Sequence, residues 1–198
     1  MFGLVYTPWS GGSGMATAKT GSFYLTETVQ LSAASASGSR IQGTIDLGAY
    51  VNVATGQAIA IDSVDFVYQA GTDFSSDVSQ MLAGNGALTT QLTDLNPGSA
   101  FVRADNQSLI ASGALNIDVA NAIASHSSDI FPDNYGTAGT LSEMFMVVND
   151  TLYVTAGNDN AAVGAQTVSV TARIRARVVK LGSKDWMALA LQSTASDN

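Results

Sequence analysis

A strict alternation of apolar and polar residues runs through residues 167–178, which read TVSVTARIRARV. Successive side chains of a β-strand point to opposite faces of its sheet, so this pattern predicts one long strand over residues 167–181. We expect the apolar face of the strand to lie in the protein core. That face comprises Val168, Val170, Ala172, Ile174, Ala176 and Val178.

Similar runs, rich in β-branched and aromatic residues, occur along the rest of the chain and are separated by Gly, Asn, Asp and Ser. About eight or nine strands with few helices are typical of an all-β sandwich or barrel. Besides the last strand, the predicted strands cover residues 23–31, 40–47, 58–69, 87–95, 101–103, 108–117, 144–148 and 151–155.

Residues 144–148 and 151–155 flank the dipeptide Asn149-Asp150. Asn and Asp tolerate the positive φ angles of a two-residue type I′ turn, so the sequence predicts a β-hairpin here. Its register would place Val147 opposite Leu152. Both faces of the hairpin are apolar, so we expect it to be buried on both sides.

Short helices are predicted at two places. Asp77 is suited to cap a helical turn, and Ser183 is suited to cap a helix that carries Trp186 near the end of the chain. Residues 118–126 fit either a third helix or a continuation of the preceding strand.

The composition narrows the classes of function. The chain of 198 residues has no cysteine, which excludes disulfides and sites built from thiolates. Charged residues make up only 12% and the formal net charge is −8, which disfavours general binding to nucleic acid or to anionic membranes. No signal peptide and no apolar stretch of about 20 residues is evident, so we expect synthesis in a cytoplasm.

The predicted organisation is a strand and flexible arm over residues 1–20, followed by a single β-sandwich domain over residues 21–198. The arm is inferred from the glycine- and serine-rich run at residues 10–17.

Catalytic and metal-binding patterns are weak. His126 is the one histidine, and we interpret it as an exposed loop residue. Asp62 and Asp65 lie three apart, so an ideal strand would place them on opposite faces and a shared site would need a β-bulge. Residues 157–160 and 133–134 offer oxygen ligands for calcium, but ordinary turns explain them equally well. The sequence predicts no enzyme and no cofactor.

The clearest candidate site is basic and lies near the end of the chain. Five of the eight basic residues gather there, namely Arg173, Arg175, Arg177, Lys180 and Lys184. Period-two geometry sends the three arginines to one side of the strand. They form either a solvated face or a ridge that meets an acidic copy of the chain, a genome or a lipid headgroup. We expect replacement of the three arginines to weaken assembly without destabilising the monomer.

Taken together, the strand count with long loops, the N-terminal arm, the weakly charged surface and the long last strand leading to Trp186 resemble single jelly-roll capsid proteins of tailless icosahedral viruses. The resemblance implies a jelly-roll β-sandwich that assembles into the shell of a virion through contacts with copies of itself and with other capsid proteins. A genome or an internal membrane is a further implied partner. In that family the basic residues usually crowd the N-terminal arm, whereas here five of the eight lie within residues 173–184.

Two other functions stay open. A carbohydrate- or receptor-binding sandwich, as in fibre, tail or adhesin proteins, would use Trp9, Tyr135 or Trp186 to stack on sugar. A glycosidase would need two facing carboxylates and ranks last.

Overall fold

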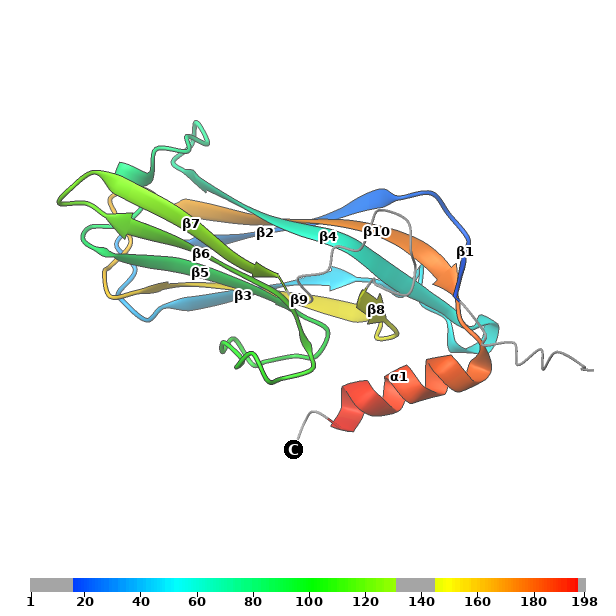
Figure 1. The fold of residues 1–198 in the computed structure, drawn as a ribbon. Helices are drawn as coiled ribbons and strands as arrows, with labels where there is room; N and C mark the ends of the chain where they lie inside the picture. Colours follow the sequence, from blue (N-terminus) through cyan, green and yellow to red (C-terminus); the bar gives the residue numbers. More distant parts are fainter. Residues whose placement is uncertain (1–15, 131–144, 196–198) are drawn as a thin grey trace, which may run out of the picture.

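The computed structural model describes residues 16–130 and 145–195 (Figure 1). Within these residues the chain forms ten β-strands, two 3-10 helices and one α-helix. In chain order they are β1 (Thr17–Ala18), β2 (Phe23–Leu31), β3 (Arg40–Asp46), η1 (Val53–Thr55), β4 (Gln57–Ala70), η2 (Val78–Gln80), β5 (Gly86–Thr93), β6 (Leu109–Asp118), β7 (Ile123–Ile130), β8 (Phe145–Val147), β9 (Thr151–Asp159), β10 (Val168–Lys180) and α1 (Ser183–Ala195).

The strands form two antiparallel sheets that face each other. In the first sheet the order is β2–β10–β4–β8, and β1 pairs with the last residues of β10 beyond the end of β2. In the second sheet the order is β3–β9–β5–β6–β7. The long central strand β10 therefore has neighbours on both sides.

The connectivity is that of a jelly roll. The pairs β2/β10, β3/β9, β4/β8 and β5/β6 are nested in the sequence, and successive pairs alternate between the two sheets. The strand β7 is an addition at the edge of the second sheet. The predicted jelly-roll β-sandwich is confirmed.

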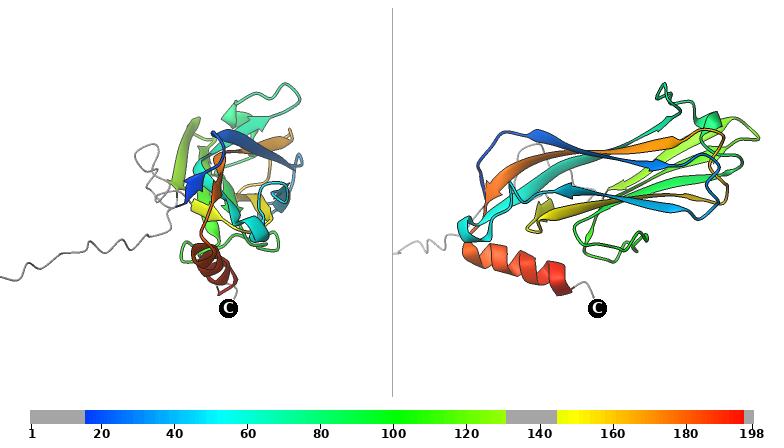
Figure 2. Two further views of the ribbon diagram at one scale, coloured as in Figure 1. Left: turned by 90° about the vertical axis from the view of Figure 1, so that its right-hand side faces the viewer. Right: turned by 180° about the vertical axis from the view of Figure 1, so that it is seen from behind.

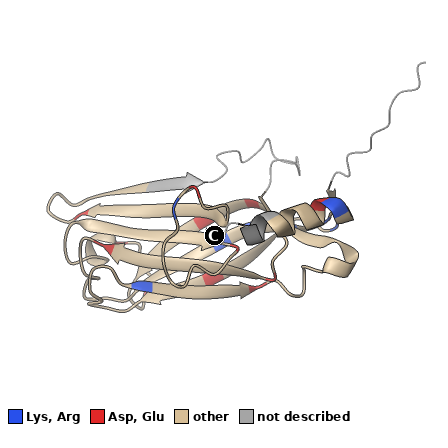
Figure 3. Cartoon of the chain, turned by 90° about the horizontal axis from the view of Figure 1, so that it is seen from below, with Lys and Arg blue, Asp and Glu red and all other residues tan. Residues whose placement is uncertain are grey.

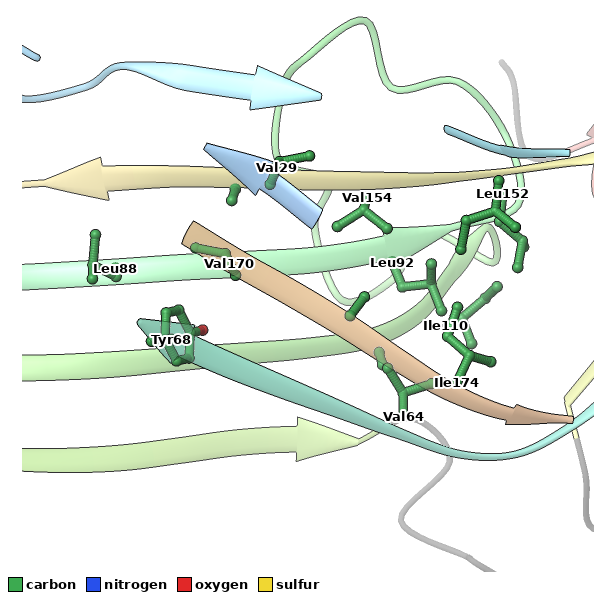
Figure 4. Packing of buried hydrophobic residues seen from close by; sticks show 14 of the residues in the cluster. Val29, Val64, Tyr68, Leu88, Leu92, Ile110, Leu152, Val154, Val170 and Ile174 are labelled. Atoms are coloured by element: carbon green, nitrogen blue, oxygen red, sulfur yellow. The ribbon is translucent and has the colours of Figure 1, made fainter. Parts of the chain in front are cut away.

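The main core lies between the sheets, where Ile174 and Val170 of β10 face Leu92 of β5 and Val154 of β9 (Figure 4). All six residues of the predicted apolar face of β10 are at most 5% exposed. Burying a side chain of valine or isoleucine size contributes roughly 1.5–3 kcal/mol. The alternation over residues 167–178 was thus a reliable guide to the core.

A smaller apolar cluster lies on the outer side of the first sheet. It joins Ala58, Ala60, Val148, Val179 and Leu181 to Trp186, Leu189 and Ala190 of α1. Figure 2 shows α1 beside one end of the sandwich, outside both sheets. Because α1 covers this end, Val179 is as buried as its neighbours on the inner face of β10.

The hairpin predicted around Asn149-Asp150 is wrong, because its two strands belong to different sheets. β8 pairs with β4, whereas β9 pairs with β3 and β5. The connecting dipeptide is hydrogen-bonded to other segments of the chain. The Asn149 side chain donates to the Asp94 carbonyl, and Leu47 N donates to the Asp150 carbonyl. The two polar residues thus form a corner between sheets. The predicted burial of this region is confirmed for Val147 and Leu152.

Two other segments differ from expectation. Residues 101–103 form no strand. The side-chain amide of Gln91 donates a hydrogen bond to the Val102 carbonyl and accepts one from Val102 N. The backbone of Val102 therefore bonds to a side chain where a strand would bond to a neighbouring strand. Residues 118–126 form neither a helix nor a continuation of β6. The Asp118 carboxylate accepts bonds from Asn121, and the chain then reverses into β7.

The short helices lie near their predicted places. Asp77 caps η2 through a bond from Ser79 N, and Ser183 is the first residue of α1. Within the described ranges, no helix has the length and apolar character needed to cross a membrane.

Part of the predicted arm, residues 1–20, is described. β1 pairs with β10, with Thr17 opposite Lys180, while residues 1–15 lie outside the described residues. The boundary between the arm and the domain over residues 21–198 stays a prediction.

Candidate functional site

Arg173, Arg175 and Arg177 emerge from the outer face of the first sheet, opposite the buried face of β10. We call these three residues the arginine face. Because β10 lies between β2 and β4, the arginine face is in the middle of a sheet, and Arg173 has Thr26 opposite it on one side and Asp65 on the other.

Arg177 and Arg175 share one buried carboxylate. Arg177 Nη2 lies 3.0 Å and Arg175 Nε 3.5 Å from Asp62 Oδ2, and Ser22 Oγ donates to the same oxygen at 3.1 Å. The Asp62 side chain is only 4% exposed, against 20% for Arg177 and 45% for Arg175. Two of the three arginines are therefore paired with a carboxylate of the same chain, and because they share one negative charge, the cluster keeps one net positive charge. Arg177 is not the fully exposed side chain that the sequence-based expectation assumed.

Asp62 reaches these arginines because of a β-bulge in β4. Ser63 lies opposite Arg175 and Ile61 opposite Ala176, which leaves Asp62 as the extra residue. The bulge puts Asp62 on the outer face together with Asp65, which lies opposite Arg173. A sequence signal for it exists: the core positions of β4 change from odd numbers, Ile59 and Ile61, to even numbers, Val64 and Tyr68.

Arg173 is the third member of the arginine face and is exposed. Its guanidinium lies 5.3 Å from the centre of the Tyr24 ring, a cation–π distance. Within the described residues no ion pair involves Arg173.

Lys180 is the last residue of β10 and Lys184 lies in the first turn of α1, so both lie apart from the arginine face. Figure 3 shows basic and acidic residues together at the end of the sandwich where α1 begins. Lys19 joins them because it follows β1, which pairs with the end of β10. We call these three residues, which are all the lysines of the chain, the lysine end. Sequence reasoning missed Lys19, since nothing local indicates that it meets the opposite end of the chain.

A hollow of about 690 Å³ opens at the lysine end. The turn η1 forms one wall and is fixed to β10 by a bond from Leu181 N to the Gly56 carbonyl. Gly56 adopts φ +68° and lies so close to the Leu181 carbonyl that a Cβ would clash with it. The side chains that line the hollow include Lys19, Lys180, Val53, Trp186 and Met187.

The charge around the hollow is unbalanced. No acidic residue is among those that line it, and within the described part of the chain no ion pair involves any of the three lysines. Asp185 is the next residue after Lys184, in the first turn of α1. The indole Nε1 of Trp186 is buried and has no hydrogen-bond partner among the described residues.

The other candidate residues do not converge. His126 is exposed as predicted, but it lies in strand β7 rather than in a loop, with its ring 6.2 Å from that of Tyr68. Among the described residues no group of three or more His, Cys, Asp and Glu side chains is placed to hold a metal ion. Of the proposed calcium ligands, Asp159 pairs with Arg40. Trp9, Tyr135 and residues 133–134 lie outside the described residues.

A comparison of the chain with models of known protein families finds no match, and a comparison with curated proteins finds no relative.

Proposed function

We propose that the chain is a structural subunit that assembles with copies of itself, as a capsid protein does in the shell of a virion. It has no catalytic role in this proposal. Jelly rolls recur in viral capsids, in lectin domains and in cupins, so the fold is compatible with the proposal but does not select it.

The observation that carries the proposal is the exposure of large apolar side chains at both ends of the sandwich. Exposed apolar side chains that gather into one contiguous patch mark surfaces for partners. Eight large apolar residues are exposed in the described part of the chain: Val53 lies in η1, Met187 and Leu191 lie in α1, Phe74, Val119 and Ile123 lie at the opposite end, and Tyr24 and Ile41 lie in β2 and β3. Exposed apolar side chains at two separate ends suit a subunit that contacts more than one neighbour.

The test is the mass of the natively purified protein, measured by multi-angle light scattering over a range of concentrations and combined with negative-stain microscopy. We expect defined oligomers or particles. A protein that stays monomeric at every concentration would overturn the proposal.

A second candidate is a carbohydrate-binding jelly roll. It is favoured by the hollow beside Trp186, since pockets that bind small molecules measure roughly 300–1,000 Å³. A glycan array separates the two functions: selective binding that is lost in Trp186→Ala, by a protein that remains monomeric, would support this second candidate.

A further inference from the structure

The end of the sandwich opposite α1 carries acidic and apolar side chains together. The connection between β4 and β5 and the turn between β6 and β7 meet there, where Asn85 Oδ1 accepts a bond from Val119 N (Figure 2). Asp73 and Asp77 are exposed there and Asp118 is half-buried, and we call this region the acidic end. Hydrogen bonds from Ser79 and Gln80 lower the pKa of Asp77, and bonds from Asn121 lower the pKa of Asp118, so both stay charged at neutral pH.

Phe74 stands out at the acidic end. It is 56% exposed and its φ is +56°, a left-handed conformation that is strained for a bulky side chain. The turn is held by a bond from Gln69 Nε2 to the Phe74 carbonyl at 3.1 Å and by one from Ala70 N to the Ser75 carbonyl at 2.6 Å. The backbone thus fixes an aromatic ring in solvent, next to the Asp73 carboxylate.

The hollow at the lysine end has the complementary features. Its apolar lining includes Trp186, Met187 at 61% exposure and Val53 at 67% exposure, and Lys19 and Lys180 lie beside them. An aromatic ring flanked by carboxylates at one end therefore matches an apolar hollow flanked by ammonium groups at the other.

We propose that copies of the chain associate end to end, with the Phe74 ring of one copy in the hollow of the next and Asp73 and Asp77 facing Lys19 and Lys180. The inference rests on the proposed self-assembly and names the surfaces that meet. The two ends lie at opposite extremes of one molecule, so the Phe74 ring of a copy cannot reach the hollow of that same copy. The contact joins two different surfaces and is heterologous, which generates rings or open chains rather than closed two-fold dimers.

Charge reversal on one end at a time tests this contact. Lys180→Glu alters the lysine end and Asp73→Lys the acidic end. Each substitution alone should weaken association by about tenfold or more, because like charges then face each other across the contact. A one-to-one mixture should recover association, since the intact acidic end of Lys180→Glu meets the intact lysine end of Asp73→Lys.

Matched controls and a second variant complete the test. Arg103→Glu and Asp105→Lys make the same charge changes in the exposed connection between β5 and β6 and should associate like the wild type. Phe74→Ala should weaken association without loss of folding, because the ring is not part of the core. Circular dichroism verifies that each variant is folded, and light scattering measures the mass.

The outcomes separate the two proposals. If the wild type assembles and both charge variants assemble equally well, or if their mixture recovers nothing, the end-to-end contact is wrong while self-assembly stands. If the wild type is monomeric, the proposed function itself fails. If Lys180→Glu instead loses binding to phosphatidylglycerol vesicles while its assembly is unchanged, the lysine end serves a lipid surface and the end-to-end contact is overturned.

Discussion

Asp62 is a buried carboxylate at the β-bulge of β4, and no other described residue differs as much from what an ideal strand would give. Its carboxylate is buried under Arg177 and Arg175, and Oδ1 has no hydrogen-bond partner among the described residues. A buried carboxylate is costly unless it is paired, so its arginine partners act chiefly by offsetting that cost. The three arginines, which the sequence pattern treats as equivalent, are therefore expected to differ in their effect on stability.

Arg177→Gln should lower the free energy of unfolding by about 2 kcal/mol. Breaking a fully buried ion pair costs roughly 3–5 kcal/mol, and here Arg175 and Ser22 still contact Asp62 Oδ2. The matched control Arg173→Gln should cost no more than about 1 kcal/mol, as is usual for an exposed charge. Urea unfolding measures both. Equal effects of the two substitutions would show that Asp62 does not depend on Arg177.

Tyr68 makes the stability of the fold sensitive to alkali. Burial raises the pKa of its hydroxyl to about 12, and the hydroxyl lies 3.2 Å from Thr90 Oγ1. The folded pKa exceeds the unfolded value of 10.0, so the contribution to stability is complete below pH 10.0 and is lost as the pH rises toward about 12.

In that interval the free energy of unfolding should fall by up to about 1.4 kcal/mol per pH unit on account of Tyr68. Tyr68→Phe removes the ionisable group, so its stability should decline less steeply than that of the wild type. Urea unfolding of both proteins at a series of alkaline pH values gives the two slopes. Identical slopes would contradict the assignment.

At the scale of elements, the clearest difference between the sequence-based prediction and the structure is the strand that pairs with β8. The dipeptide Asn149-Asp150 carries a strong turn signal, yet the turn does not determine which strand lies beside β8. That choice depends on β4, whose residues Ile59–Ile61 pair with β8 and are more than 80 residues away in the sequence.

Engineered disulfides distinguish the two pairings, and the absence of cysteine in the natural chain makes the experiment simple. Ala60 and Met146 are directly opposite each other in the sheet, at a separation compatible with a disulfide. We expect Ala60→Cys/Met146→Cys to oxidise readily, whereas Met146→Cys/Tyr153→Cys, the pair of the sequence-predicted hairpin, should keep two free thiols. Thiol titration after mild oxidation decides, and the reverse result would restore the hairpin.

The described surface is weakly charged, with the three lysines and Asp185 at the end where α1 begins and Asp73 and Asp77 at the opposite end. Charges that face each other across a contact are screened by salt, whereas apolar contacts are not. The end-to-end contact therefore makes a prediction about ionic strength that a purely apolar contact does not.

Association should weaken between about 0.1 M and 1 M sodium chloride, because the Debye length falls from about 10 Å to about 3 Å. The melting temperature should change little over the same range, since the core is apolar and few ion pairs are formed. Light scattering and calorimetry on the same samples check both. Association that strengthens with salt would indicate a contact dominated by apolar surface.

Local sequence determined most of the strands and the direction of their apolar faces, although residues 101–103 form no strand. Residues 23–31 and the alternating face of β10 were predictable because period-two alternation and β-branched residues act within a few positions. Tertiary structure alone decided which strands pair, which partners surround Asp62 at the bulge, and how Lys19 comes to lie beside Lys180. These features depend on contacts between residues far apart in the chain, and the packing of two sheets around one core selects among the pairings that local pattern allows.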